Sequence, residues 1–277
     1  RSLSRPAVVH TTPRSPSGWL PIAHATLHNL QDVSVSVPSG VMTVVTGVAG
    51  SGKSSLINGA FVRAFPEVVC IDQGAIGGSR RSNITTYTGI LDPIRRLFAQ
   101  ANAASASLFS ANSGGACPVC KGLGTTETDL ALMEPIVSVC ERCRGRRFTD
   151  EALQYRMRGK NIGEILAMRV AEAKTFFDEP EIAPALERLD EVGLAYLSLG
   201  QPLSSLSGGE RQRLKLATEL GRTGRIYVFD EPTSGLHLSD IDRLFRLLDR
   251  LIERGATVVV IEHQLDVIAR ADWLIDM

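Results

Sequence analysis

Hydrophobic residues at both ends of the chain are spaced as in short strands that alternate with helices. Val33, Val35 and Val37 alternate with polar residues, which is typical of a half-buried strand. Continuous apolar runs predict buried strands at 41–45, 68–71, 226–229, 257–261 and 273–275. Helices are predicted between them, at 55–64, 208–220, 241–254 and 265–271. This alternation predicts an α/β fold with a mainly parallel sheet.

The middle of the chain has a different pattern. Residues 74–116 are rich in small and polar residues, with one helix expected around 93–101. Further helices are predicted at 162–168, 171–177 and 182–192. Residues 1–21 hold prolines among serines and arginines, so we expect a linker there. The expected organisation is a linker at 1–21, an α/β core at 22–90 and 222–277, and a helical region at 91–221 inserted into that core.

Composition narrows the class of protein. The 277 residues are 44% hydrophobic and 22% charged with zero formal net charge, which excludes wholesale disorder and an overall basic field. The longest apolar runs, such as 258–261, are strand-sized, so we expect no membrane span and a cytoplasmic protein. The chain starts without a methionine and stops just after a predicted strand, and we therefore expect it to be part of a longer protein.

Four of the five cysteines have a metal-binding spacing. Cys117 and Cys120 form one C-x2-C pair, and Cys140 and Cys143 form another. Two such pairs supply four thiolates to one tetrahedral zinc and leave no open position, so the zinc is expected to be structural. The module spans 117–147, and free thiols are the alternative interpretation. Cys70, in an apolar run, is expected to be a buried hydrophobic residue.

A phosphate-binding loop follows the predicted strand at 41–45. The sequence from Gly47 to Ser54 matches G-x4-G-K-[S/T] and precedes a predicted helix, which is the context that this motif needs. Backbone N–H groups and the helix N-terminus would surround the phosphates, Lys53 would reach the β- and γ-phosphates, and Ser54 would bind Mg²⁺. The residues predicted to hold the nucleotide here are Gly47, Val48, Ala49, Gly50, Ser51, Gly52, Lys53, Ser54 and Ser55.

Two more segments fit a nucleotide site. Asp230 and Glu231 end the apolar strand at 226–229, where Asp230 would bind Mg²⁺ and Glu231 would polarise the attacking water. The alternative is an acidic strand end that faces solvent. Ser207, Gly208, Gly209 and Glu210 open a predicted helix, whose capped, glycine-rich N-terminus would form a second phosphate site. One nucleotide does not need two such cradles, but two modules facing head to tail do.

In this order the motifs resemble those of the ABC ATPase family. Gln73 follows the strand after the phosphate loop, the loop at Ser234–His237 follows Asp230-Glu231, and His263 follows the next strand. The resemblance implies that the signature at Ser207 completes the ATP site of an opposed module. It also implies that Gln73 contacts Mg²⁺ and the water, and that His263 contacts the γ-phosphate. The catalytic candidates are therefore Glu231, Lys53, His263 and Gln73.

The long segment between Gln73 and Ser207, with its four cysteines, resembles the UvrA family in particular. The strings at 81–89, 199–210 and 262–273 resemble the C-terminal ABC module of that family. This resemblance covers residues 22–277 and implies ATP hydrolysis, double-stranded DNA binding in nucleotide excision repair, pairing with a second ABC module, and contact with other excision-repair subunits. Residues 125–139 look more like the short UvrA paralogues of antibiotic self-resistance, which is the alternative function. A transporter motor is disfavoured by the cysteine insertion.

The charge distribution predicts a local DNA-binding patch. Basic residues outnumber acidic ones between Cys140 and Lys160, whereas acidic residues dominate between Asp178 and Glu191. Arginines beside a rigid metal knuckle suit contacts to DNA phosphates, and a solvated charged turn is the alternative. The DNA-contact candidates are Arg80, Arg81, Lys121, Arg142, Arg144, Arg146 and Arg147.

Overall fold

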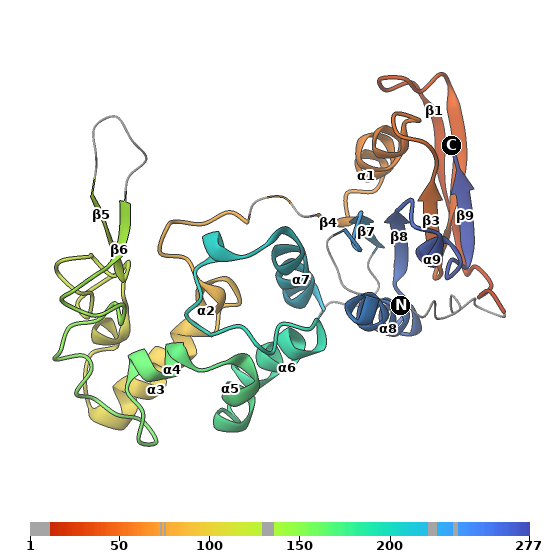
Figure 1. The fold of residues 1–277 in the computed structure, drawn as a ribbon. Helices are drawn as coiled ribbons and strands as arrows, with labels where there is room; N and C mark the ends of the chain where they lie inside the picture. The colour runs from red at the N-terminus through yellow and green to blue at the C-terminus, as the bar shows by residue number, and fades with distance from the viewer. Residues whose placement is uncertain (1–11, 73, 75, 129–135, 221–225, 235–237) are drawn as a thin grey trace, which may run out of the picture. The chain divides into compact units, whose positions relative to one another are not determined.

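The computed structural model of the chain describes residues 12–72, 74, 76–128, 136–220, 226–234 and 238–277. The chain divides into two compact units, which are described separately below (Figure 1). The sheet unit comprises residues 1–75 and 211–277, and the inserted unit comprises residues 76–210. The chain therefore leaves the sheet unit once and returns to it, as an insertion requires.

The sheet unit is built on a five-stranded sheet in the order β4-β7-β8-β3-β9, with every neighbouring pair parallel. Its strands are β3 (Met42–Thr46), β4 (Val69–Ile71), β7 (Ile226–Asp230), β8 (Thr257–Ile261) and β9 (Trp273–Asp276). This confirms the predicted parallel α/β core. Because the strands are parallel, their carboxyl ends share one edge of the sheet, where ligand sites collect in such folds.

A second, antiparallel layer covers one face of this sheet. It consists of β1 (Gly18–Ala25) and β2 (Val33–Ser39), with Leu20 opposite Val37. Val37, Val45, Phe61 and Val259 belong to one buried cluster that joins this layer, the parallel sheet and the helix after the phosphate loop. Strand residues alternate between faces, so Val44, Val258 and Val260, which are also buried, point to the opposite face.

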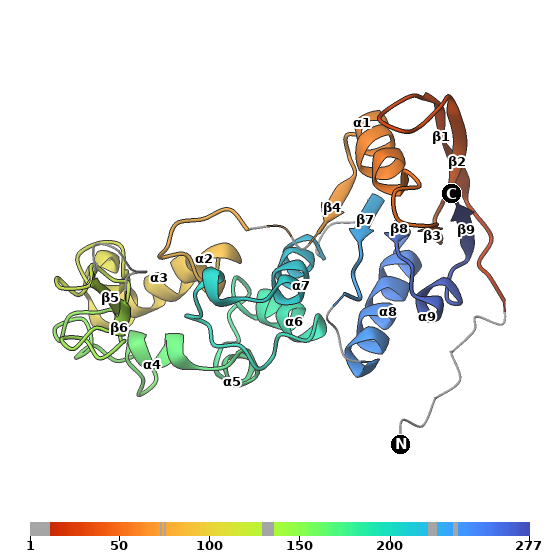
Figure 2. The same cartoon turned by 45° about the horizontal axis from the view of Figure 1, so that its top comes forward.

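The helices of the sheet unit connect these strands (Figure 2). They are η1 (Ser55–Phe61, a π-helical segment), α1 (Val62–Ala64), α8 (Leu238–Glu253) and α9 (Leu265–Ile268). The helix predicted at 265–271 is thus shorter than expected. The strand β1 begins at Gly18, within the segment expected to be a linker. Its backbone pairs with β2, and Pro21 is tolerated because β1 lies at the edge of a two-stranded sheet.

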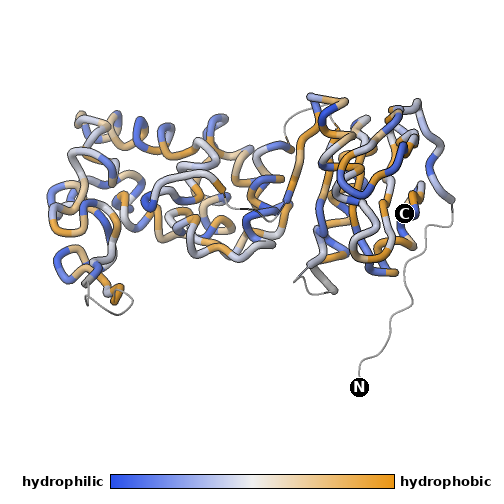
Figure 3. The backbone as a smooth tube through the Cα atoms, turned by 90° about the horizontal axis from the view of Figure 1, so that it is seen from above, coloured by the Kyte–Doolittle hydropathy of each residue, from blue (hydrophilic) through white to orange (hydrophobic). Residues whose placement is uncertain are grey.

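The inserted unit is mainly helical. In chain order its elements are α2 (Ile84–Tyr87), α3 (Leu91–Asn102), η2 (Ala106–Phe109), β5 (Thr125–Thr128), β6 (Ile136–Val139), α4 (Ile162–Ala167), α5 (Val170–Phe176), α6 (Ala183–Glu191) and η3 (Leu203–Ser205). Helix α7 (Gly208–Glu219) begins in this unit and continues into the sheet unit from Arg211. Hydrophobic and hydrophilic positions alternate along these helices, as expected for amphipathic helices that share a core (Figure 3).

The boundaries of the inserted unit differ from the expected 91–221. The unit starts at Ile76, because the backbone N–H groups of Ile84 and Thr85 bind the carbonyls of Gln201 and Leu199 at 3.3 and 3.2 Å. These bonds join the two ends of the insertion. The unit ends at Glu210, since α7 packs on the sheet strands from Gln212 onward through the contacts given below.

Two further findings concern exposure. Cys70 is exposed, so the expected buried environment is wrong. It lies on β4, an edge strand, and alternates with the buried Ile71, so its side chain points to the uncovered face. Within the described residues, no helix is long and apolar enough to cross a membrane.

Candidate nucleotide site and cysteine centre

The phosphate loop connects β3 to η1 and depends on glycines with positive φ. Gly47 and Gly52 have φ angles of 139° and 105°. A Cβ on Gly47 would lie 2.4 Å from the carbonyl oxygen of Met277, and a Cβ on Gly52 would lie 2.9 Å from a methyl carbon of Leu30. Only glycine fits both the backbone angle and the space at these two positions. The phosphate loop is therefore tightly packed at both of these glycines.

Lys53 lies across this loop. Its Nζ donates hydrogen bonds to the carbonyl oxygens of Gly47 and Val48, at 2.8 and 2.9 Å. The ammonium is thus held at the mouth of the loop by acceptors that a bound phosphate can replace. Ser54, the predicted magnesium ligand, is exposed one residue later, at the start of the helix. The roles of Lys53 in phosphate binding and of Ser54 in magnesium binding remain predictions.

The turn between β1 and β2 supports the loop from outside, which the sequence reasoning missed. Asn29 donates from Nδ2 to the carbonyl oxygen of Gly50 at 2.6 Å. Leu30, which is 4% exposed, packs against Gly52 and belongs to the core cluster. No spacing rule links residues that lie so far apart in the sequence, so only the antiparallel pairing of β1 and β2 reveals this contact.

The acidic strand end lies at the same edge of the sheet. Asp230 ends β7 and accepts a hydrogen bond from Nδ2 of Asn58 at 3.0 Å. Asn58 lies four residues after Ser54, so this bond joins the helix that follows the phosphate loop to the end of β7. Asn58 was not among the predicted site residues, although its position four residues after Ser54 places it on the same helix face. The Ser54 hydroxyl and the Asp230 carboxylate are oxygen donors, which Mg²⁺ prefers as ligands.

Glu231 follows Asp230 with an unusual backbone. Its φ is 45°, which a non-glycine residue rarely adopts, and its side chain is exposed. The backbone N–H of Glu231 binds the carbonyl of Ile261 at 3.0 Å, at the end of β8. This bond holds the backbone of Glu231 beside the segment that leads to His263. A strained residue at a functional edge is a common sign of a catalytic position.

His263 and Gln73 are the two remaining catalytic candidates. His263 follows β8, and its side chain is 64% exposed at the same edge. Gln73 lies outside the described residues, so its position is not tested. The two residues beside it are anchored: Lys215 of α7 binds Asp72 Oδ1 at 2.5 Å and the carbonyl of Gly74 at 3.1 Å. This hydrogen bond lowers the pKa of the Asp72 carboxyl.

Helix α7 also contacts the base of the site through a buried glutamine. Gln212 is 4% exposed, and its Nε2 donates to the carbonyls of Ile71 and Asp230 at 3.2 and 3.4 Å. One amide thus binds the ends of β4 and β7. No sequence pattern pointed to Gln212 beyond its place in a predicted helix. It connects the helix that begins at the signature motif with the strand ends of the sheet unit.

The signature motif in the inserted unit forms a reciprocal helix cap. The N–H of Glu210 donates to Ser207 Oγ at 3.3 Å, and the N–H of Ser207 donates to Glu210 Oε2 at 2.7 Å. The hydroxyl of Tyr196 donates to Glu210 Oε1 at 2.5 Å. The predicted cap at Ser207 is therefore present, with Gly208 and Gly209 at the helix start. Tyr196 is an additional partner that spacing did not indicate.

The four cysteines meet in one buried cluster. Their sulfur atoms all lie within 4.8 Å of one another, and those of Cys120 and Cys143 are 3.6 Å apart. A tetrahedral zinc with bonds of about 2.3 Å would place its sulfurs about 3.8 Å apart, so the cluster fits that metal. Burial raises the pKa of the Cys143 thiol, and the backbone N–H of Cys143 lowers the pKa of Cys140.

Two equivalent turns shape this centre. Lys121 and Arg144 each follow the second cysteine of a pair, with φ angles of 51° and 50°, and each precedes a glycine of positive φ. These turns wrap the backbone around the sulfurs, and the N–H of Gly124 donates to Cys120 Sγ at 3.2 Å. Lys121 and Arg144 point outward and are exposed. The knuckle geometry thus presents one cation at each turn.

The candidate DNA-contact residues fall into two groups, according to whether a carboxylate partner is found among the described residues. Arg80 forms an ion pair with Glu127, and Arg142 and Arg146 lie 3.1 and 3.9 Å from Asp150. The predicted patch therefore carries less unpaired charge than a count of arginines suggests. For Arg81, Lys121, Arg144 and Arg147, no carboxylate partner is found among the described residues.

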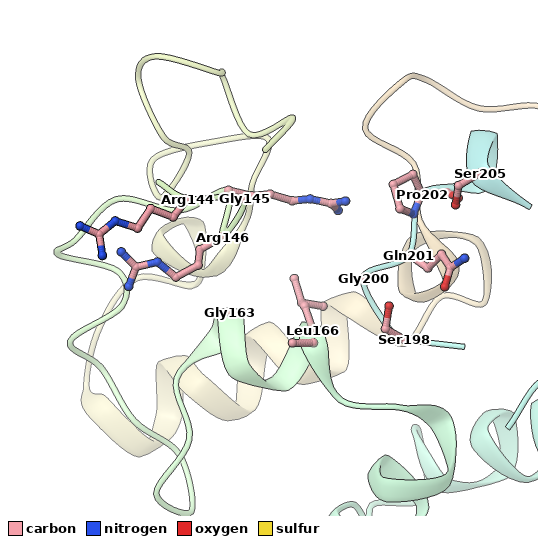
Figure 4. Close-up of a pocket in the computed structure, with 12 residues that line it drawn as sticks. Arg144, Gly145, Arg146, Gly163, Leu166, Ser198, Gly200, Gln201, Pro202 and Ser205 are labelled. Atoms are coloured by element: carbon pink, nitrogen blue, oxygen red, sulfur yellow. The ribbon is translucent and has the colours of Figure 1, made fainter. Parts of the chain in front are cut away.

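A cavity of about 460 Å³ lies between the cysteine module and the segment that leads to the signature (Figure 4). Arg144, Arg146 and Arg147 line one side, and Ser198 and Gln201 line another. Figure 4 shows the side chains of Arg144 and Arg146 extending away from Ser198 and Gln201. Burial lowers the pKa of Arg147, and the nearby Cys120 and Cys143 sulfurs raise it.

Comparisons with known proteins show which family this chain resembles. A family model described as ABC transporter matches residues 123–234. UvrABC system protein A of Vibrio parahaemolyticus is 43% identical over 96% of this chain and 32% of its own length. The Streptomyces avermitilis protein of that name is 44% identical over 96% of this chain and 30% of its own length. The chain therefore spans about a third of the length of these curated relatives.

A solved structure is similar over the same range. The crystal structure of UvrA2 from Deinococcus radiodurans matches with a TM-score of 0.89 and 45% identity, over 96% of this chain and 36% of that one. The similarity to this structure therefore includes both the parallel sheet and the elements of the inserted unit.

Proposed function

Since the chain belongs to the UvrA family of ABC ATPases, we propose that it binds and hydrolyses MgATP as one module of a DNA-repair ATPase. The observation that carries this proposal is the shared carboxyl edge of the parallel sheet. Asp230 and Glu231 lie at the end of β7 and His263 lies just after β8, while Lys53 binds the carbonyl of Gly47, directly after the neighbouring β3.

Each residue has a role that follows from its chemistry. Lys53 exchanges its carbonyl acceptors for the β- and γ-phosphates, and the loop amides bind the same oxygens. Ser54 and Asp230 would hold Mg²⁺, which would neutralise charge on the phosphates. Glu231 orients the attacking water and accepts its proton, while His263 contacts the γ-phosphate. Gln73, which follows Asp72, completes this set.

The signature motif serves a different nucleotide. We assign Ser207, Gly208, Gly209 and Glu210 to the γ-phosphate of ATP bound on a second ABC module, because the capped helix start presents backbone N–H groups and a positive dipole end. A head-to-tail pair of modules is therefore the active assembly. The domain plan that goes with this role is a nucleotide-binding core interrupted by a signature domain.

We further propose a structural zinc at the four cysteines and a DNA-binding role for the module around them. Cys117, Cys120, Cys140 and Cys143 would hold the metal and thereby fix the two knuckle turns. Lys121 and Arg144 on these turns, together with Arg81 and Arg147, would contact the phosphates of double-stranded DNA. Arg80, Arg142 and Arg146 would contribute after exchanging their carboxylate partners.

Excision repair is favoured over antibiotic self-resistance as the process. The relatives are named UvrABC system protein A, and their similarity covers nearly the whole chain. The resemblance of residues 125–139 to resistance paralogues falls partly on residues 129–135, which lie outside the described part of the chain. Other excision-repair subunits are the partners that a repair role requires.

Steady-state ATP hydrolysis by the full-length protein tests the proposal. Lys53→Ala should abolish the contribution of this site, because the β- and γ-phosphates lose their cation. Lys174→Ala is the matched control: Lys174 binds Asp190 at 2.6 Å in the inserted unit, and its loss should leave hydrolysis unchanged. Equal hydrolysis by the wild type and the Lys53→Ala variant would refute the assignment.

A further inference from the structure

A buried carboxylate that no step above uses lies between the two catalytic segments. Glu262 directly follows β8 and precedes His263, and its side chain is 1% exposed. Its backbone N–H binds the carbonyl of Val45 at 3.1 Å, next to the phosphate loop. The residue is therefore fixed in the sheet rather than in a loose turn.

The carboxylate accepts hydrogen bonds from two separate segments. Oε1 accepts from the backbone N–H of Thr233 at 3.2 Å and from the hydroxyl of Thr233. Oε2 accepts from the backbone N–H groups of His263 and Gln264, at 2.9 and 3.4 Å. Four donors thus converge on two oxygens. Only a carboxylate has the acceptor capacity for this arrangement, because an amide side chain replaces one acceptor with a donor.

The two segments carry the catalytic candidates. Thr233 lies in the turn that begins at Glu231, where the N–H of Ser234 binds the carbonyl of Glu231 at 3.1 Å. Glu231 is held in a left-handed conformation, which persists only when its surroundings impose it. Glu262 Oε1 holds this turn through Thr233, and Glu262 Oε2 holds the segment after β8 through the backbone N–H of His263.

We infer that Glu262 is a positioning residue, which fixes the water-orienting Glu231 and the phosphate-contacting His263 relative to one another through Thr233. This inference rests on the proposed ATPase function. Glu262 contacts neither the phosphate loop side chains nor the nucleotide itself in this scheme. Its loss should therefore slow the chemical step and leave ATP binding intact.

The test measures kcat and the Kd for MgATP in the full-length protein. Glu262→Gln keeps the shape but leaves backbone N–H groups without acceptors, and Thr233→Val removes the hydroxyl at nearly constant volume. Both variants should lower kcat, by roughly 10- to 100-fold for Glu262→Gln, as for a misplaced catalytic group. Kd should not change. Thr233→Ser, which keeps the hydroxyl, should have the kcat of the wild type. The double variant with Thr233→Val and Glu262→Gln should be no slower than Glu262→Gln alone.

A matched control separates positioning from general stability. Asp272 is a second buried carboxylate, 1% exposed, and its Oδ2 accepts from the N–H of Met42 at 2.9 Å. It lies at the amino end of β3, away from the proposed site. Asp272→Asn should lower the Tm without lowering the kcat of the folded protein. If Asp272→Asn lowers kcat as much as Glu262→Gln does, the positioning role is wrong.

Amide hydrogen exchange distinguishes failure of this inference from failure of the ATPase proposal. Without nucleotide, Glu262→Gln should speed exchange at the backbone amides of Thr233 and His263, since both amides donate to the carboxylate that this variant removes. Unchanged exchange at both segments, or an unchanged kcat in an active enzyme, overturns the inference. A wild-type protein without ATPase activity would refute the proposed function, and the exchange result would still decide whether Glu262 couples the two segments.

Discussion

The salt dependence of DNA binding offers a quantitative prediction from the two knuckle turns. Lys121 and Arg144 are exposed, and no carboxylate partner is found for them among the described residues. If each neutralises one DNA phosphate, each contributes about 0.9 to the slope of log K against log salt. Replacing both with glutamine, which keeps much of the side-chain length, should make the slope shallower by about 1.8.

The measured consequence is large enough to resolve. Between 50 and 200 mM salt, a slope change of about 1.8 reduces the fold loss of affinity by a factor of about 12. Fluorescence anisotropy of a labelled duplex, titrated with full-length protein at several salt concentrations, gives the slope directly. Glutamine, like lysine and arginine, carries a side chain, so the cost of the left-handed backbone at these two positions changes little. The knuckle geometry should therefore be preserved at both.

The control lies in the same unit. Arg96 is also exposed but binds Glu181 at 2.7 Å, so Arg96→Gln should leave the slope unchanged. An unchanged slope in the Lys121→Gln, Arg144→Gln variant would refute the phosphate-contact assignment. A slope that falls equally in Arg96→Gln would show that total charge, and not the knuckle turns, governs binding.

Two further predictions concern the cysteines. Metal analysis should find about one zinc per chain, and strong acidification should release it, because protons compete with zinc for the four thiolates. Absence of zinc after chelator-free purification would contradict the four-cysteine centre. Cys70 should be the thiol that a small alkylating reagent modifies in zinc-loaded protein, and its rate should keep rising above the pH at which a free cysteine levels off. Although Cys70 is exposed, partial desolvation of its sulfur and the nearby Asp72 and Asp230 carboxylates raise its pKa and so shift thiolate formation to higher pH. Mass spectrometry locates the label, and a rate that levels off at the pH of an ordinary cysteine would contradict this environment.

Much of the fold follows from local patterns. The buried strands at 42–46, 226–230 and 257–261 are continuous apolar runs, and the phosphate loop and the cysteine pairs have fixed spacings. Such features depend on residues that are close in sequence, so periodicity and spacing suffice to predict them. The parallel order of strands follows from their alternation with helices.

The features that the sequence missed depend on contacts between distant segments. Asn29 with Gly50, Asn58 with Asp230, and Gln212 with the ends of β4 and β7 become partners only when the sheet is assembled. Cys70 illustrates the opposite error, since an apolar run suggests burial but an edge strand leaves one face uncovered. In the same way, ion pairs with Glu127 and Asp150 reduce the free charge that the count of arginines had suggested.

The most direct test of the central claim is the chemical state of nucleotide retained by the full-length Glu231→Gln variant. After incubation with labelled MgATP and rapid removal of free nucleotide, the wild type should retain mainly ADP at this site. The variant should retain unhydrolysed ATP, because Glu231 can no longer accept a proton from the attacking water. If Glu231→Gln converts bound ATP to ADP at the wild-type rate, then the carboxyl edge of this sheet is not the hydrolytic site proposed here.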